Sequence, residues 1–176
     1  MLITAALMLA ILVAVVLFLL EERGVQRKAQ MEGPVSSWVV PDQWALASGT
    51  REGKPIITRF NMGLRALMGH PSFTKQIGIA VPFSHPRDDG LPASEEGQQL
   101  SDLEDEIRRR FTVGNESLFV GVITTGGMRE FVLYTSNEVG AISKAQQLAR
   151  ETTHHEVQFV INDDPEWSVF KAFSGQ

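Results

Sequence analysis

The sequence contains no cysteine, a single tyrosine and only three tryptophans among its 176 residues. Without cysteine the chain can form no disulfide, no thiolate nucleophile and no cysteine-ligated zinc or iron–sulfur site. It also lacks a Gly-x-Ser-x-Gly motif, and its paired glycines do not precede a helix as a dinucleotide-binding loop requires. We therefore expect no catalytic residue, no metal ligand and no cofactor.

Positive charge is scarce in the larger part of the chain. Residues 31–176 carry 13 Lys and Arg against 19 Asp and Glu, which gives a net charge of −6. Proteins that bind nucleic acid by neutralising phosphates present a basic face. We therefore expect no nucleic-acid partner.

Charge, proline and glycine are all missing from the run that begins at Leu2 and ends at Leu20. As a helix this run is about 28 Å long, close to the ~30 Å hydrocarbon core of a bilayer. A cleaved signal peptide is the alternative, but its apolar region has roughly 7–15 residues and follows a basic segment. The run predicts an uncleaved transmembrane helix over residues 1–21.

The basic residues near this run predict its orientation. Arg23, Arg27 and Lys28 all follow the run, whereas no basic residue precedes it. Because basic residues stay on the cytoplasmic side, the globular part is expected in the cytoplasm. An internal start at Met31 would instead give a soluble form, and the sequence leaves this possibility open.

Residues 22–41 form a tether, and residues 42–176 form one globular α+β domain. Strands are predicted over residues 43–48, 56–61, 76–83, 117–124, 128–134 and 156–162. Helices are predicted over residues 93–113 and 135–151, with a short one after Pro165. From residue 76 this order predicts a ferredoxin-like βαββαβ core with an extra N-terminal hairpin and a short C-terminal helix. Helices would cover one face of the sheet and leave the other open.

Several short motifs occur together over residues 42–173. They are Trp44, Gly53-Lys54-Pro55, Arg59-Phe60-Asn61, Gly90-Leu91-Pro92, Leu103-Glu104-Asp105, Arg129-Glu130, Tyr134 and Asp164-Pro165-Glu166-Trp167. Together they resemble the bacterial domain of unknown function 695. The resemblance implies a bacterial protein, and the apolar run predicts that a single span holds it in the inner membrane. No reaction is known for the family, so no catalytic residue is carried over.

Five polar residues are candidates for binding a ligand or partner, namely Arg59, Asn61, Arg129, Glu130 and Tyr134. Arg59 and Asn61 share one face of their strand and could line a polar pocket with Arg129 or Tyr134 if that face is free of helices. The planar guanidinium of arginine binds a carboxylate or phosphate in bidentate fashion. Alternatively, Arg59 pairs with a nearby carboxylate such as Glu130 and fixes the hairpin.

Two charged segments have simpler interpretations. Residues 104–106 are acidic and lie four positions before Arg108, Arg109 and Arg110, which predicts ion pairs along an exposed helix face. In residues 85–90, one histidine and two aspartates are of metal-ligand type. Neighbouring aspartates cannot both face one ion easily, so a solvated turn is the preferred interpretation.

These observations favour a non-enzymatic binding or regulatory module that holds a protein partner or small ligand on the open sheet face. Two alternatives remain. One is an enzyme acting on a phosphorylated or carboxylated metabolite through Arg59, Arg129 and Tyr134, together with Glu104 or Glu130. The other is a structural subunit of an envelope assembly.

Overall fold

The computed structural model describes residues 33–174. The chain divides into two units, Met1–Val39 and Val40–Gln176. In the described part of the first unit, the 3-10 helix η1 (Val35–Ser37) is followed by Trp38. The Nε1 of Trp38 donates a 3.2 Å hydrogen bond to the carbonyl of Gly33. The other helices and strands described belong to the second unit.

Six strands of the second unit form one sheet. They are β1 (Trp44–Arg51), β2 (Lys54–Asn61), β3 (Lys75–Pro82), β4 (Ser117–Thr125), β5 (Met128–Thr135) and β6 (Gln158–Asp163). Their order across the sheet is β1-β2-β4-β5-β3-β6, and every neighbouring pair is antiparallel. Strands β1 and β6 are therefore the edges.

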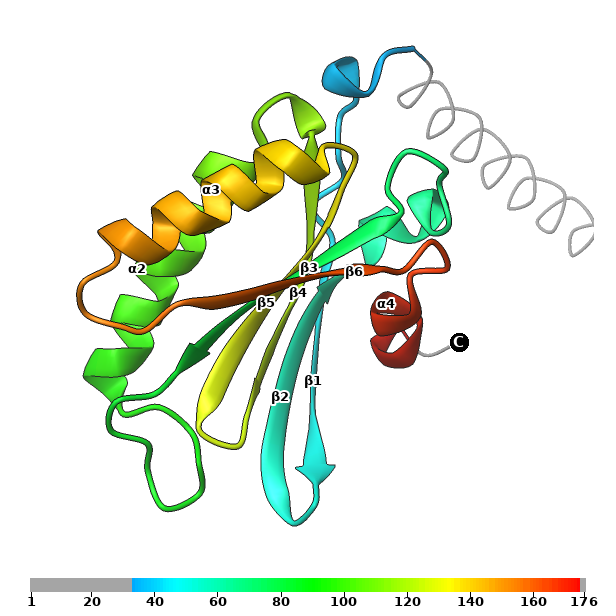
Figure 1. The fold of residues 1–176 in the computed structure, drawn as a ribbon. Coiled ribbons are helices and arrows are strands. Elements are labelled where there is room, and N and C mark those ends of the chain that lie inside the picture. Colours follow the sequence, from blue (N-terminus) through cyan, green and yellow to red (C-terminus); the bar gives the residue numbers. More distant parts are fainter. Residues whose placement is uncertain (1–32, 175–176) are drawn as a thin grey trace, which may run out of the picture. The chain divides into compact units, whose positions relative to one another are not determined.

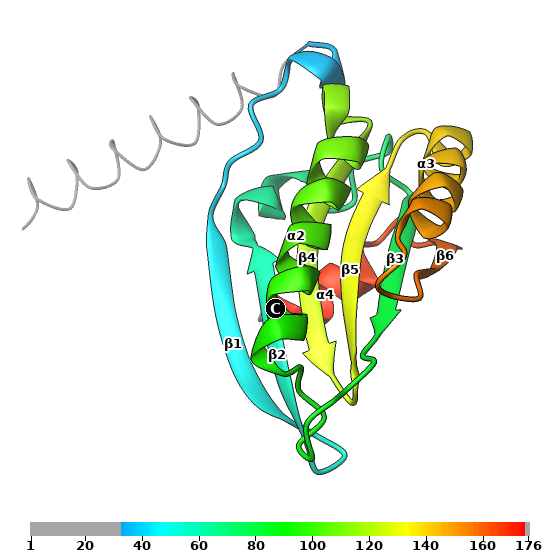
Figure 2. The ribbon, with the colours of Figure 1, turned by 90° about the vertical axis from the view of Figure 1, so that its left-hand side faces the viewer.

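Helices lie on both faces of this sheet. Helices α2 (Ser94–Phe111) and α3 (Glu138–Glu151) cover one face, and the short α4 (Ser168–Phe173) lies against the other (Figures 1 and 2). Two further 3-10 helices are η2 (Met62–Leu67) after β2 and η3 (Val113–Asn115) after α2. We refer to the two sides of the sheet as the α2–α3 face and the α4 face.

The main hydrophobic core lies between the sheet and helices α2 and α3. The apolar stripe of α2 is fully or almost fully buried there, with Leu100, Leu103, Ile107 and Phe111 as its members. Alternate residues of the strands supply the other half, because side chains along a strand point to opposite faces in turn. A second aromatic cluster on the α4 face contains Phe60, Tyr134, Trp167 and Phe170.

The start of α3 differs from the prediction. Thr135 and Glu138 predict a capping box, but α3 begins at Glu138 and the side chain of Asn137 accepts the N–H of Gly140 at 2.9 Å. Thr135 is still part of strand β5, and its hydroxyl donates to the carbonyl of Glu116. The threonine is unavailable to the helix because strand pairing holds it.

The predicted fold class is wrong. The structure has one six-stranded antiparallel sheet, in which the first hairpin joins the other four strands through the pairing of β2 with β4 over residues 56–60. Within residues 33–174 no helix is long and apolar enough to cross a membrane. The predicted transmembrane helix concerns residues 1–21, which lie outside the described residues.

Candidate functional site

Three arginines from different parts of the chain converge on one cavity of about 250 Å³ on the α2–α3 face. We call this cavity the arginine cleft. Its lining residues are Ile57, Arg59, Arg87, Leu91, Pro92, Val122, Thr124 and Arg129. They come from β2, β4, β5 and the loop between β3 and α2.

Strand register places the cleft residues on the same side of the sheet. Arg59 is opposite Val122 in the β2–β4 pair, and Thr124 is opposite Arg129 in the β4–β5 pair. Directly paired residues of antiparallel strands share a face. Because Val122 belongs to the core beneath α2 and α3, both arginines lie on the helix-covered face.

Backbone hydrogen bonds fix the loop that carries Arg87. The carbonyl of Gly90 accepts the N–H of Gly127 in the β4–β5 turn at 2.9 Å, and Phe83 donates to the carbonyl of Gly127 at 2.7 Å. Gly90 has a φ of +77°, a conformation that favours glycine. Asp89 accepts the N–H of Leu91 at 3.0 Å and pairs with Arg87 at 2.7 Å. The loop is therefore held against the hairpin with Arg87 beside the sheet.

Arg59 is paired with Glu104 of α2, which is buried. The other oxygen of Glu104 accepts two hydrogen bonds from Arg108, at 3.1 and 3.2 Å. The Arg108 guanidinium lies 4.5 Å from the ring centroid of Trp44 and 4.2 Å from that of Phe119, which are cation–π distances. Glu104 thus joins two arginines and orients Arg59 at the wall of the cleft.

Arg129 differs from the other two arginines of the cleft. It is partly buried, and its Nε donates to the hydroxyl of Thr124 at 3.2 Å. Within residues 33–174 its guanidinium forms no ion pair with a carboxylate. Burial lowers the pKa of Arg129, the charge of Glu104 opposes this shift, and the charge of Arg59 adds to it. An anion beside Arg129 would stabilise its charged form.

The five predicted site residues do not form one site. Arg59 and Arg129 line the arginine cleft, as the polar-pocket hypothesis requires, but on the helix-covered face. Asn61 is buried, and its side chain accepts from Gln43 and Gly63 and donates to the carbonyl of Pro41. Asn61 therefore holds the end of β2, outside the arginine cleft.

The remaining two predicted residues lie on the α4 face. Tyr134 is completely buried against Trp167, so it cannot reach a ligand. Glu130 is partly buried above Gly78, where a Cβ would lie only 2.6 Å from its Oε1. The interpretation that Arg59 pairs with a carboxylate is confirmed, but its partner is Glu104 and not Glu130.

The sequence did not single out Arg87 or Thr124. Arg87 was interpreted as part of a solvated turn, and only the contact between that loop and the β4–β5 hairpin brings it to the cleft. The sequence carried one hint, because Gly90-Leu91-Pro92 is among the motifs of the family resemblance.

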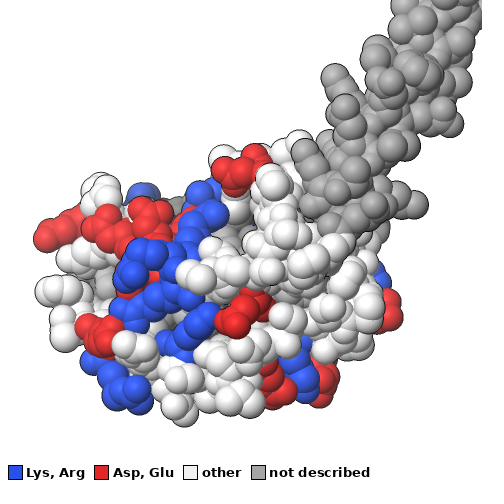
Figure 3. Space-filling model, turned by 90° about the horizontal axis from the view of Figure 1, so that it is seen from above, with Lys and Arg blue, Asp and Glu red and all other residues white. Residues whose placement is uncertain are grey.

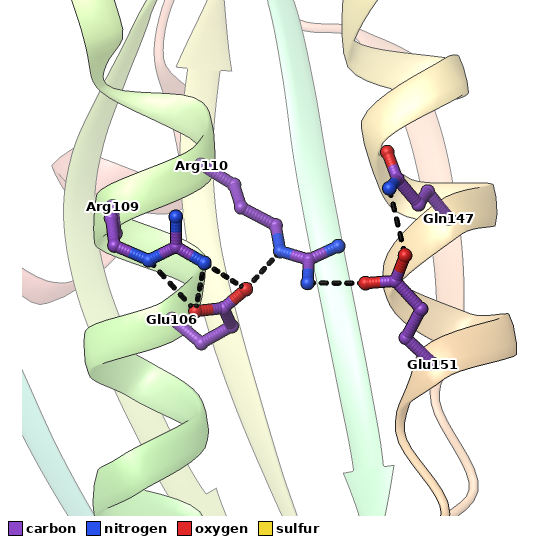
Figure 4. Close-up of polar contacts among 5 residues, drawn as sticks. All are labelled: Glu106, Arg109, Arg110, Gln147 and Glu151. Carbon is purple, nitrogen blue, oxygen red and sulfur yellow. Dashed lines mark hydrogen bonds and ion pairs between the residues drawn. The ribbon is translucent and has the colours of Figure 1, made fainter.

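Two of the three predicted ion pairs of α2 are present, Glu104 with Arg108 and Glu106 with Arg110, whereas Arg109 pairs with Glu106 and not with Asp105. Arg110 pairs with Glu106 four residues earlier and reaches across to Glu151 of α3, while Arg109 pairs with Glu106 (Figure 4). In the space-filling view of Figure 3, basic side chains gather in one area with acidic side chains directly beside them. The guanidiniums of Arg109 and Arg110 already have carboxylate partners, so they are weaker candidates for binding an anion.

Histidine and carboxylate side chains gather at a different cavity, of about 410 Å³, near the start of α2. Glu96, one of its lining residues, is buried, and its Oε1 lies 3.8 Å from Nδ1 of buried His155 and accepts the N–H of Ser84 at 2.6 Å. Among the described residues, no three His, Asp or Glu side chains are arranged to hold a metal ion.

A comparison with family models matches residues 42–173 to the family of unknown function DUF695. No curated protein and no solved structure gives a significant match. The match covers three quarters of the 176 residues and includes Arg59, Arg87 and Arg129. The chain therefore belongs to DUF695, the family that the motifs of its sequence resemble.

Proposed function

We propose that the protein is a non-enzymatic binding module whose arginine cleft holds the anionic group of a small ligand. One observation carries the proposal. Arg129 is a partly buried guanidinium without a carboxylate partner among the described residues, and it shares its cavity with Arg59 and Arg87. Placing a cation in a partly buried site is unfavourable unless an anion compensates it.

The geometry supports this cleft over the open sheet face that the sequence suggested. The sheet face that the sequence leaves open is the α4 face. Helix α4 packs against part of it through the contacts of Phe60 with Phe170 and Phe173. The α4 face also carries a single acidic candidate, Glu130, while the arginines lie on the other side of the sheet.

The residues of the cleft suit binding better than proton transfer. The side chains that line it are arginine, threonine, proline and aliphatic residues, none of which exchanges a proton easily near neutral pH. The carboxylate of Glu104 is bonded through both oxygens to Arg59 and Arg108, and that of Asp89 is bonded to Arg87 and to the N–H of Leu91. Tyr134, which the enzyme hypothesis requires, is on the opposite face.

The proposal is tested by thermal unfolding of the full-length chain with acetate, hexanoate, citrate or inorganic phosphate at constant ionic strength. A bound ligand at ten times its Kd adds ~1.4 kcal/mol of stability. For a chain of this size, we expect Tm to rise by about 3–6 °C with at least one of these anions.

Two variants test whether the rise in Tm comes from binding in the arginine cleft. Arg129→Met removes the unpaired guanidinium and should abolish the rise in Tm. Arg150→Met removes an equal charge from an exposed position of α3 and should retain it. If no anion raises Tm, or if both variants respond like the wild type, the arginine cleft is not a binding site.

A further inference from the structure

Strand β1 is an open edge of the sheet. Figure 2 shows it on the outside of the sheet, with no described element beyond it. Residues 45–51 are all exposed, and Leu46 is 70% exposed on the α2–α3 face, where it lies opposite Arg59 of β2. An open edge presents unpaired backbone N–H and C=O groups, which can bond to a strand of another chain.

The register of the first hairpin shows which backbone groups of β1 are free. Gln43 faces β2, because its carbonyl accepts the N–H of Met62 and its own N–H donates to the side chain of Asn61. The pairing of β1 with β2 then runs without a bulge, so alternate residues bond to β2 and the residues between them point outward. The outward residues are Trp44, Leu46, Ser48 and Thr50.

Features that protect an edge strand are absent from most of β1. Edge strands of monomeric proteins are usually short, bulged, or interrupted by charged residues or proline. None of these features occurs between Trp44 and Thr50. The opposite edge, β6, is shorter and ends at Asp163, with Asp164 and Pro165 directly after it. Strand β1 is therefore the edge that is suited to pairing with another strand.

We propose that β1 pairs with β1 of a second copy of this chain, antiparallel and related by a two-fold axis at Ala47. In this register each outward residue of one strand meets an outward residue of the other. Leu46 lies opposite Ser48 of the second copy, and Trp44 lies opposite Thr50. The two six-stranded sheets then become one continuous sheet. This contact is separate from the binding function proposed for the arginine cleft.

The side chains of β1 suit contact with the same strand. A two-fold axis brings identical residues close together, and residues 43–50 contain no charge that would repel its own copy. On the α2–α3 face the two Leu46 side chains are diagonal neighbours across the axis, so each removes apolar surface of the other from water. On the α4 face only Ala45, Ala47 and Gly49 meet, and these small residues allow the strands to approach.

Charged residues lie only at the ends of the paired segment. Asp42 precedes it, and Arg51 and Glu52 follow it. In the antiparallel arrangement, Asp42 of each copy comes near both Arg51 and Glu52 of the other. The charges have both signs and are in contact with water, which screens them. The ends therefore neither drive the pairing nor prevent it.

Cysteine cross-linking of the full-length chain tests the pairing and its register. The chain has no cysteine of its own, so a single introduced cysteine can form a disulfide only between two copies. Ala47 meets itself at a non-hydrogen-bonded position, where Cα atoms are about 4.5 Å apart, within the range of a disulfide. We expect Ala47→Cys to form disulfide-linked dimers under mild oxidation. Ala45→Cys and Gly49→Cys should form them only when the two variants are mixed.

A charge on the edge tests whether this contact holds the dimer together. Sedimentation velocity at increasing concentrations should show the wild type in equilibrium between monomer and dimer. Leu46→Lys places two like charges beside the axis, and we expect the Kd of the dimer to rise at least about tenfold. Val160→Lys makes the same kind of change at an exposed residue of β6, the other edge, and should leave the Kd unchanged.

The outcomes distinguish the occupant from the register. A chain that stays monomeric, with an Ala47→Cys variant that does not cross-link to itself, would overturn the second copy as the partner of β1. Cross-linking of that variant to a different protein instead would assign the edge to a strand of that protein. If Ala45→Cys alone cross-links as readily as Ala47→Cys, the register is wrong. If Leu46→Lys leaves the Kd unchanged, the dimer forms through another surface.

Discussion

The hydroxyl of Tyr134 donates a 2.6 Å hydrogen bond to Oδ2 of Asp164. The same carboxylate accepts from the N–H and hydroxyl of Ser168, at 2.9 and 2.7 Å, where α4 begins. The ring of Tyr134 stacks on Trp167 with 4.2 Å between centroids. Two motifs that suggested the family therefore fasten α4 to the sheet, and this explains why Tyr134 is unavailable to a ligand.

We expect Tyr134→Phe to lower the free energy of unfolding by about 1.5–3 kcal/mol, the usual range for a hydrogen bond to a charged group. The phenylalanine ring keeps the stacking on Trp167, so the loss reports the hydroxyl alone. Urea unfolding at neutral pH measures it. A loss below about 0.5 kcal/mol would show that the bond between Tyr134 and Asp164 contributes little.

The same cluster predicts a dependence of stability on pH. Burial raises the pKa of Asp164, but the hydrogen bonds from Tyr134 and Ser168 outweigh burial and hold this pKa below its ordinary value. A depressed pKa in the folded state stabilises the fold above the unfolded pKa of about 3.9. This stabilisation is lost as the pH falls through the folded pKa.

The measurement compares the wild type with Asp164→Asn across this pH range. The variant should be less stable at neutral pH, and the difference should shrink as the solution is acidified below about pH 3.9. A difference that stays constant down to the lowest pH would mean that ionised Asp164 is not the source of the stability.

Glu130 predicts a dependence of stability on pH that is opposite to that of Asp164. Burial raises the pKa of this carboxyl, and no ion pair with a described residue offsets the shift. The unfolded chain then ionises first, so Glu130 destabilises the fold as the pH rises above about 4.3. We expect Glu130→Gln to raise the Tm at neutral pH but not in acid.

A matched control for this variant is Asp105→Asn, which removes an exposed carboxylate from α2. It should not reproduce the pH-dependent gain. If Glu130→Gln lowers the Tm at neutral pH, the carboxylate of Glu130 has a stabilising partner and is not merely buried.

Gly121 is required where β4 passes beneath Phe60. A Cβ at this position would collide with the Phe60 ring, which itself stacks on Phe173 with 5.1 Å between centroids. We expect Gly121→Ala to cost about 1–3 kcal/mol through overpacking, as measured by urea unfolding.

Gly97 provides the contrast, because a Cβ there would meet no atom within 4 Å. It lies inside α2, where alanine is favoured over glycine, so Gly97→Ala should stabilise the fold by about 0.5–1 kcal/mol. Equal losses in both variants would contradict the role assigned to the ring of Phe60.

Local patterns of the sequence determine much of the globular part. The stripe of Leu100, Leu103, Ile107 and Phe111 predicts the buried side of α2, and all four side chains are in the core. The spacing of Glu106 and Arg110 predicts their ion pair, which the structure contains. Such features follow from the period of a single helix or strand, so they need no knowledge of distant residues.

The candidate site depends on the tertiary structure instead. Alternation along β2 shows that Arg59 and Asn61 share a face, but it does not show that α2 covers that face or that Glu104, 45 residues away, is the partner of Arg59. The meeting of Arg87 with Arg129 likewise requires the loop to pack on the β4–β5 hairpin. Strand periodicity relates neighbours within one element, whereas the arginine cleft results from contacts between elements that only the packed core brings together.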